Sequence, residues 1–298
     1  MVTLGSAKPP CAGSIPAPAS EEMKKTALAI VIAFAIFTSF GLKTSNSQEF
    51  TFEKSYQDYI FTQSRYSESF STYQKARDAY LKNQTLTLKE EARKKTLEML
   101  RNRDELLRVY LTALRVKIVE VGGLTQAEKE IVLAKLDSEV IYYKDHKEGY
   151  KDSDTLETLF SRSKESENRY KLDSGRKIYE ALFNTSLGEV VDSRLKHQEA
   201  YTSIRGEIDT KVAEGKVRID PFNRWFTDIE GVVGELKIQE DKAKTAILKL
   251  YADGSTNPAS VFKTSIVPFE KSKDLLSTIN RFLEELLTSF NSLVSVQK

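Results

Sequence analysis

Residues 52–84 read FEKSYQDYIFTQSRYSESFSTYQKARDAYLKNQ. Positions separated by alternating steps of four and three residues carry mostly aromatic side chains in this stretch. Such steps place one side chain per turn on a single face of a helix. The stretch therefore predicts one long helix that ends at Asn83-Gln84 and carries an aromatic seam. The seam consists of Phe52, Tyr56, Tyr59, Gln63, Tyr66, Phe70, Tyr73, Arg77 and Tyr80.

A second helix follows a short connection. Thr87 and Glu90 have the spacing of a capping box, in which each side chain bonds the backbone N–H of the other residue. Gly122-Gly123 ends the apolar periodicity that follows them. A connection this short joins helices that pair antiparallel, so the first two helices are expected to lie side by side, with about 30 residues each.

The middle of the chain is divided by similar signals. Thr125 with Glu128 is a second capping box, and Gly149–Asp154 forms the next break. The helix after that break is polar on nearly every side between residues 161 and 171. This part is therefore expected to be exposed or poorly packed.

Three further helix starts are expected towards the end of the chain. Ser186 with Glu189 predicts either a new helix or a kinked continuation to about residue 215. Asp220-Pro221 and Asn257-Pro258 each place proline at a first helical position. The last helix is expected to kink at Pro268, because proline lacks the backbone N–H.

Composition agrees with helices that have one apolar face. The chain is 40% hydrophobic and 30% charged, with 13 Gly and 7 Pro in 298 residues, and no segment has a strand-like alternation. We predict an all-α protein, an elongated bundle of antiparallel helices with coiled-coil-like seams. The net charge of +2 comes from the residues before Gln48, so the body is neutral and no nucleic acid is expected as a partner.

An apolar run, ALAIVIAFAIFTSFGL, covers residues 27–42 and follows Met23-Lys24-Lys25. A positive start, an apolar core and small residues at its end are typical of an export signal. Sixteen residues at about 1.5 Å each reach about 24 Å, short of the roughly 30 Å hydrocarbon core. The length favours a cleaved signal, and a single uncleaved membrane anchor is the alternative.

This run sets the predicted organisation. Residues 1–22, rich in Pro, Ala, Gly and Ser, are expected to be disordered and to precede a natural start at Met23. Residues 23–47 form the signal peptide or anchor. Residues 48–298 form the helical bundle, with an internal boundary near 215–221, and are expected to be extracytoplasmic, either secreted or tethered to the cytoplasmic membrane.

Residues for catalysis or metal binding are scarce in the body. The one cysteine, Cys11, lies before the apolar run, so the body has no thiol. His146 and His197 have no partner at metal-ligand spacing, and no glycine-rich phosphate loop occurs. We expect no cofactor and no enzymatic activity.

Two interpretations of the aromatic seam remain open. The rings pack against the second helix with their hydroxyls at the edge, or they line a groove that grips sugar rings or a partner helix. The residues of such a partner or ligand surface would be Tyr56, Tyr59, Tyr66, Phe70, Tyr73 and Trp225.

The last helix has a second seam, which is aliphatic. It could mediate assembly into a homo-oligomer through Leu276, Ile279, Leu283, Leu286, Phe290 and Leu293. Taken together, the sequence predicts a non-enzymatic, exported or membrane-tethered scaffold that binds another protein or an envelope component. The alternative is an extracytoplasmic sensor or solute-binding domain with a tyrosine-lined groove.

Overall fold

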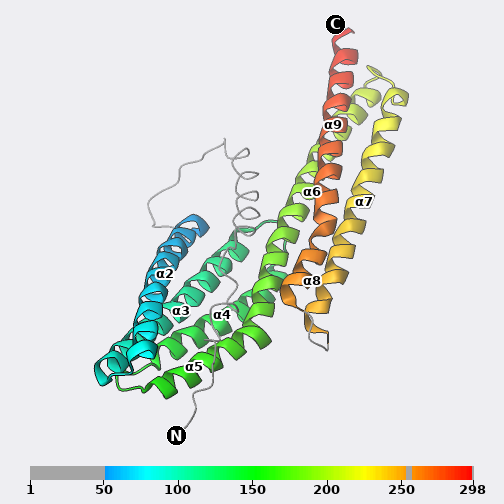
Figure 1. Ribbon diagram of the computed structural model, residues 1–298. Coiled ribbons are helices and arrows are strands. Elements are labelled where there is room, and N and C mark those ends of the chain that lie inside the picture. Colours follow the sequence, from blue (N-terminus) through cyan, green and yellow to red (C-terminus); the bar gives the residue numbers. More distant parts are fainter. Residues whose placement is uncertain (1–50, 253–256, 297–298) are drawn as a thin grey trace. The chain divides into compact units, whose positions relative to one another are not determined.

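The computed structural model describes residues 51–252 and 257–296. Every regular element in these residues is a helix, which confirms the predicted all-α class (Figure 1). The apolar run 27–42 lies outside them, and none of the described helices is long and apolar enough to cross a bilayer. The elements are α2 (Phe52–Asn83), α3 (Leu86–Glu120), α4 (Gln126–Glu148), α5 (Leu156–Arg169), η1 (Tyr170–Ser174), α6 (Gly175–Ala213), η2 (Asp220–Phe222), α7 (Asn223–Ile247), η3 (Leu248–Tyr251), α8 (Pro258–Ser265) and α9 (Val267–Val296).

The helices form two compact units. Unit 1 comprises the described residues up to Val116 together with Leu136–Gly175, and unit 2 comprises Lys117–Lys135 and the described residues from Arg176 onward. Residues 215–221, where the sequence suggests an internal boundary, lie inside unit 2. Each unit has its own buried interior.

In unit 1, α2 and α3 pack against each other in opposite directions. The Tyr59 ring lies 5.2 Å from the Tyr110 ring. Further along α2, Tyr66 packs against a cluster that contains Leu97 and Leu100. Since later residues of α2 meet earlier residues of α3, the pair is antiparallel.

In unit 2, α6, α7 and α9 surround the main apolar cluster, and α7 runs antiparallel to both neighbours (Figure 1). Trp225 at the start of α7 bonds Glu285 late in α9, whereas Glu235 further along α7 pairs with Lys271 near the start of α9. The aliphatic seam of α9 contributes to this interior. The cluster consists of Ile208, Val217, Phe222, Phe226, Ile229, Val233, Leu236, Ile279, Leu283, Leu286 and Phe290.

Two helix starts agree with the sequence signals. Thr125 Oγ1 accepts a hydrogen bond from Glu128 N at 3.3 Å, and Glu128 Oε2 accepts one from Thr125 N at 2.8 Å, which confirms the capping box. Asn257 caps α8 through a bond from Ala259 N to its side-chain oxygen. The kink expected at Pro268 takes the form of a break at Ile266 between α8 and α9.

The predicted start at Thr87 is wrong, and at Ser186 only one of the two predicted alternatives holds. α3 begins two residues earlier than a cap at Thr87 allows. Thr85 Oγ1 accepts a hydrogen bond from Leu88 N, and the Glu90 carboxylate binds Arg93 instead of the backbone. No helix starts at Ser186; α6 continues through it to Ala213, which agrees with the predicted continuation to about residue 215. The neighbouring Thr185 bonds its hydroxyl to the carbonyl of the preceding turn, so it is accommodated inside the helix.

Candidate functional site

The loop between α4 and α5 is closed by its own polar residues. Glu148 ends α4, and Thr155 caps α5 by accepting a hydrogen bond from Thr158 N at 3.2 Å. Asp154 Oδ2 accepts from Lys151 N at 2.9 Å and bridges the turn. These bonds explain Asp154 as a turn-forming residue and Thr155 as the cap of α5.

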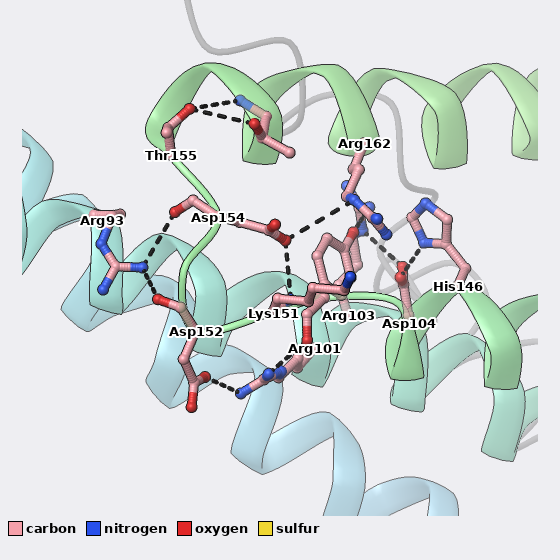
Figure 2. A network of polar contacts seen from close by, with 12 residues as sticks. Arg93, Arg101, Arg103, Asp104, His146, Lys151, Asp152, Asp154, Thr155 and Arg162 are labelled. Atoms are coloured by element: carbon pink, nitrogen blue, oxygen red, sulfur yellow. Dashed lines mark hydrogen bonds and ion pairs between the residues drawn. The ribbon is translucent and has the colours of Figure 1, made fainter.

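Two arginines of α3 hold this loop from outside (Figure 2). Arg93 Nη1 donates to the carbonyl oxygens of Asp152 and Asp154, at 2.6 and 3.1 Å. Arg101 donates from Nη2 to the Tyr150 carbonyl at 2.6 Å and from Nη1 to the Asp152 carboxylate at 3.1 Å. The guanidinium groups therefore fix the loop against α3, since charge-assisted hydrogen bonds are among the stronger polar contacts.

Behind the loop lies a buried aspartate–histidine pair. Asp104 on α3 is fully buried, and one of its oxygens lies 2.5 Å from Nδ1 of His146 on α4. An ionised carboxylate only accepts hydrogen bonds, so Nδ1 is the donor. The other Asp104 oxygen accepts from Ser166 on α5 and from Arg103, each at 3.2 Å. One carboxylate thus joins three helices.

Aromatic rings enclose the histidine. The Tyr142 ring stacks on His146 at 17° between planes, and the Tyr150 ring meets it edge-on at 79°. Burial raises the pKa of Tyr142 to about 12 and holds that of Tyr150 well above its ordinary value. His146 Nε2 and the Tyr142 hydroxyl are buried and have no hydrogen-bond partner among the described residues.

A second buried carboxylate lies before His146 on α4. Glu139 is fully buried, accepts from Arg169 at 2.5 and 3.2 Å, and accepts from the Ser174 hydroxyl at 2.5 Å. Ser174 in turn accepts from the Tyr143 hydroxyl at 3.0 Å. Ser174 belongs to η1, a single π-helical turn that places it against α4. Unit 1 therefore has a continuous polar interior between α3, α4 and α5.

The buried pair is closed to substrates. A histidine beside a carboxylate is the arrangement of a general base, but a base needs its free nitrogen within reach of the proton that it abstracts. His146 Nε2 has no accessible surface, and its side chain is 6% exposed. Within the described ranges no three His, Cys, Asp or Glu residues lie close enough to hold a metal ion. The geometry supports a structural role for the pair.

An open cleft of about 680 Å³ lies on the outer side of α3, between α2, the end of α4 and the loop. Leu97 and Asn102 line it together with charged side chains from all three elements. The carboxylates are Glu98, Glu105 and Asp152. The cationic residues are Arg65, Arg93, Lys94, Arg101 and Lys147.

The predicted partner residues are divided between the two units. Tyr59 is buried, and Tyr66, Phe70 and Tyr73 pack against the cluster around Leu97, so these rings face the interior of unit 1. Tyr56 is half-buried beside Tyr59. None of these rings lines the cleft.

Trp225 belongs to unit 2. Its ring packs on the apolar cluster of that unit, while its Nε1 donates to Glu285 at 3.2 Å. The structure therefore assigns Trp225 to a different interior from the aromatic seam of α2.

The polar interior is the feature that sequence reasoning missed, although a signal exists. Leu100, Asp104, Leu107 and Leu111 follow the same steps of four and three residues as the apolar seam of α3. On α4, Glu139 and His146 occupy seam positions between Leu136 and Tyr150. A charged residue at a seam position indicates a buried ion pair when partners occur at seam positions of neighbouring helices.

The expectation that residues 161–171 are exposed or poorly packed is wrong in part. Ser163 and Ser166 are buried, and both bond to the charged residues of α3. Small hydroxyl side chains allow α5 to approach α3 closely and still satisfy buried charges. A polar helix face can therefore be an interior face when its partners are polar too.

Comparisons with protein-family models, with curated proteins and with solved structures found no match.

Proposed function

We propose that the chain is a non-enzymatic helical scaffold or interaction protein, exported or tethered to the cytoplasmic membrane through residues 27–42. Its body would act on the extracytoplasmic side as an elongated, coiled-coil-like bundle of antiparallel helices. Its partner would be another protein or a component of the cell envelope.

One observation carries the non-enzymatic part of the proposal. The buried carboxylates Asp104 and Glu139 each bond residues from two other segments of unit 1, and neither lines the cleft on the outer side of α3. Groups that resemble catalytic residues are thus engaged in holding helices together. This supports a protein that acts by presenting a rigid surface, because rigid packing preserves the shape that a partner recognises.

The sequence supports the location. Met23-Lys24-Lys25 before an uncharged run of sixteen residues has the order of charge and hydrophobicity that export machinery recognises. The body that follows carries basic and acidic residues in equal number, a balance that does not favour nucleic acid as its partner.

The alternative, a sensor or solute-binding domain with a tyrosine-lined groove, has less support. Tyr59 is buried, and Tyr66, Phe70 and Tyr73 have their rings against apolar side chains of the same unit. Rings engaged in this way offer little face to a sugar or a partner helix.

Assembly through the α9 seam has little support for a similar reason. Four of its six residues, Ile279, Leu283, Leu286 and Phe290, belong to the buried cluster of unit 2, and Leu276 packs against that cluster. Of the six, only Leu293 is exposed.

The proposal can be tested on cells that produce the full chain. Ile32→Lys with Ile36→Lys should keep the protein in the cytosol, because each lysine in an apolar helix costs about 2.5–3.5 kcal/mol on membrane insertion. Ile32→Leu with Ile36→Leu is the matched control and should behave as the parent. Fractionation with intact-mass analysis measures the outcome.

Each result is decisive. The proposed location is supported if the parent protein is found in the membrane or exported fraction, either uncleaved or beginning between Leu42 and Gln48. An uncleaved parent in the cytosol overturns it. A membrane-impermeant crosslinker then tests the interaction: the parent should form adducts of higher mass, and the double-lysine variant should form none.

A further inference from the structure

The cleft on the outer side of α3 has an excess of positive charge. Five cationic side chains and three carboxylates line it. Their ion pairs extend to Lys95, Arg108 and Glu90 outside the lining, which makes seven cationic side chains and four carboxylates in all. Glu90 serves both Arg93 and Lys94, and Glu105 serves both Arg108 and Lys147. The five cations and three carboxylates that line the cleft leave an excess of two positive charges, so an anion would lower the electrostatic energy of the cleft.

Part of this charge is held in place before any ligand arrives. Two of the hydrogen bonds that fix Arg93 go to backbone carbonyls of the loop, and one that fixes Arg101 goes to the Tyr150 carbonyl. Carbonyl oxygens are neutral acceptors, so these bonds orient the guanidinium groups without cancelling their charge. A group that is already oriented loses less conformational entropy when it binds a ligand.

Other hydrogen-bond donors around the cleft are available to bind a ligand. Arg65 projects from α2 with an exposed side chain and forms no ion pair with any described residue. Lys94 reaches Glu90 only at 4.0 Å, the limit of an ion pair, and is 68% exposed. Asn102 lines the cleft between these two helices. Arginine, lysine and amide donors from facing helices match the several oxygen atoms of a phosphate or carboxylate group.

We propose that the cleft between α2, α3 and the loop 149–155 binds a small polyanion through its phosphate or carboxylate groups, with Arg65 and Lys94 as the main free donors. The volume of about 680 Å³ lies in the range of small-ligand sites. Leu97 supplies an apolar wall for the rest of the ligand. This site goes beyond the proposed scaffold function and does not depend on where the protein is located.

Calorimetric titration of the purified full chain with pyrophosphate and, separately, with citrate tests the proposal in a chloride buffer free of other polyanions. The parent should bind at least one probe, and the probe that binds identifies the oxyanion as phosphate or carboxylate. Arg65→Gln with Lys94→Gln should weaken that binding about tenfold or more, since two charge-assisted hydrogen bonds are lost.

Lys75→Gln with Lys82→Gln is the matched control. Both lysines are exposed on α2, neither lines the cleft, and the change in net charge is the same. This variant should weaken binding less than about twofold, because screening limits the effect of distant exposed charges. Equal weakening in the two double variants would overturn the proposal, as would the absence of binding of both probes to the parent at millimolar concentration. Circular dichroism should show both variants as helical as the parent.

Discussion

The two units hold their helices together by different chemistry. Unit 1 buries two carboxylates, Asp104 and Glu139, with Arg103 and His146 beside them. The main cluster of unit 2 is entirely apolar, and the buried ion pair Arg194–Glu240 joins α6 to α7 separately from it. Both units are helical and of similar size, so the difference lies in what their seams contain.

The comparison has an energetic consequence. An apolar interior tolerates modest changes of shape, because each contact is weak and many neighbours can adjust. A buried charge has few partners, and removing one leaves the others in a medium that stabilises charge poorly. Unit 1 should therefore be the more sensitive unit to single polar substitutions.

The largest effect is expected from Asp104→Ala. The change leaves Arg103 and His146 without their shared carboxylate, and breaking a buried pair on one side typically costs about 3–5 kcal/mol. Denaturant unfolding measures the loss. Hydrogen exchange should locate it in α3, the second half of α4 and α5, with α7 and α9 unchanged.

Asp152→Ala is the control for this substitution. Asp152 also pairs with an arginine of α3, but its side chain is 86% exposed. Exposed ion pairs contribute about 0–1 kcal/mol, so the loss should be small. If the two alanine variants were equally stable, the polar interior of unit 1 would not be what distinguishes it from unit 2.

Signals that act within a few residues were predictable from the sequence. The first helix begins and ends where its seam and the Asn83-Gln84 dipeptide indicate. The Thr125–Glu128 capping box and the Asn257 cap were also predicted correctly. In each case the partners are at most four residues apart, so no knowledge of the fold is required.

Signals that depend on distant partners were not predictable in the same way. Asp104 and His146 are 42 residues apart, and their pairing follows from the register of α3 against α4. A lone histidine and an aspartate inside a charged run look solvated when each is considered on its own helix. The same limit applies to Ser163 and Ser166 of α5, because their burial depends on the neighbouring helix α3.

A smaller effect is expected in unit 2 from Gly188→Ala. A Cβ atom at this position would lie 2.6 Å from the carbonyl oxygen of Gly122, a backbone atom that cannot move aside alone. The α6 backbone and the turn before α4 must separate, and overpacking of this kind costs about 1–3 kcal/mol. Thermal unfolding should show a lower melting temperature, and hydrogen exchange should place the change in unit 2.

Gly206→Ala is the matched control on the same helix. A Cβ atom there meets nothing within 4 Å. Because alanine favours the helix interior over glycine, this variant should be more stable than the parent by about 0.5–1 kcal/mol. If both variants lost stability, the close approach at Gly188 would not be the reason for the effect of Gly188→Ala, because Gly206 has no such neighbour.

The smallest effect concerns pH and returns to unit 1. Glu105 on α3 accepts hydrogen bonds from Arg108 at 2.7 and 2.9 Å and from Lys147 on α4 at 2.7 Å. These bonds lower the pKa of Glu105 from 4.5 to about 2, and the bonds from Arg108 have the largest effect. The folded state thus binds this proton less readily than the unfolded state. The stabilisation is complete above about pH 4.5 and is lost as the pH falls towards 2.

Glu105→Gln should therefore lower the free energy of unfolding by about 1 kcal/mol at neutral pH, a value that allows for the partial exposure of the carboxylate. The difference in free energy of unfolding between this variant and the parent should shrink as the pH falls from 4.5 to about 2. Urea unfolding at a series of pH values measures this difference.

The comparison with unit 2 comes from Glu235→Gln, because Glu235 pairs with Lys271 between α7 and α9 and its pKa is also lowered. The Glu235 side chain is 34% exposed against 24% for Glu105, so solvent screens its pair somewhat more. A pH-dependent loss as large as that of Glu105→Gln would show that the inter-helix pairs of Glu105 and Glu235 stabilise the two units alike.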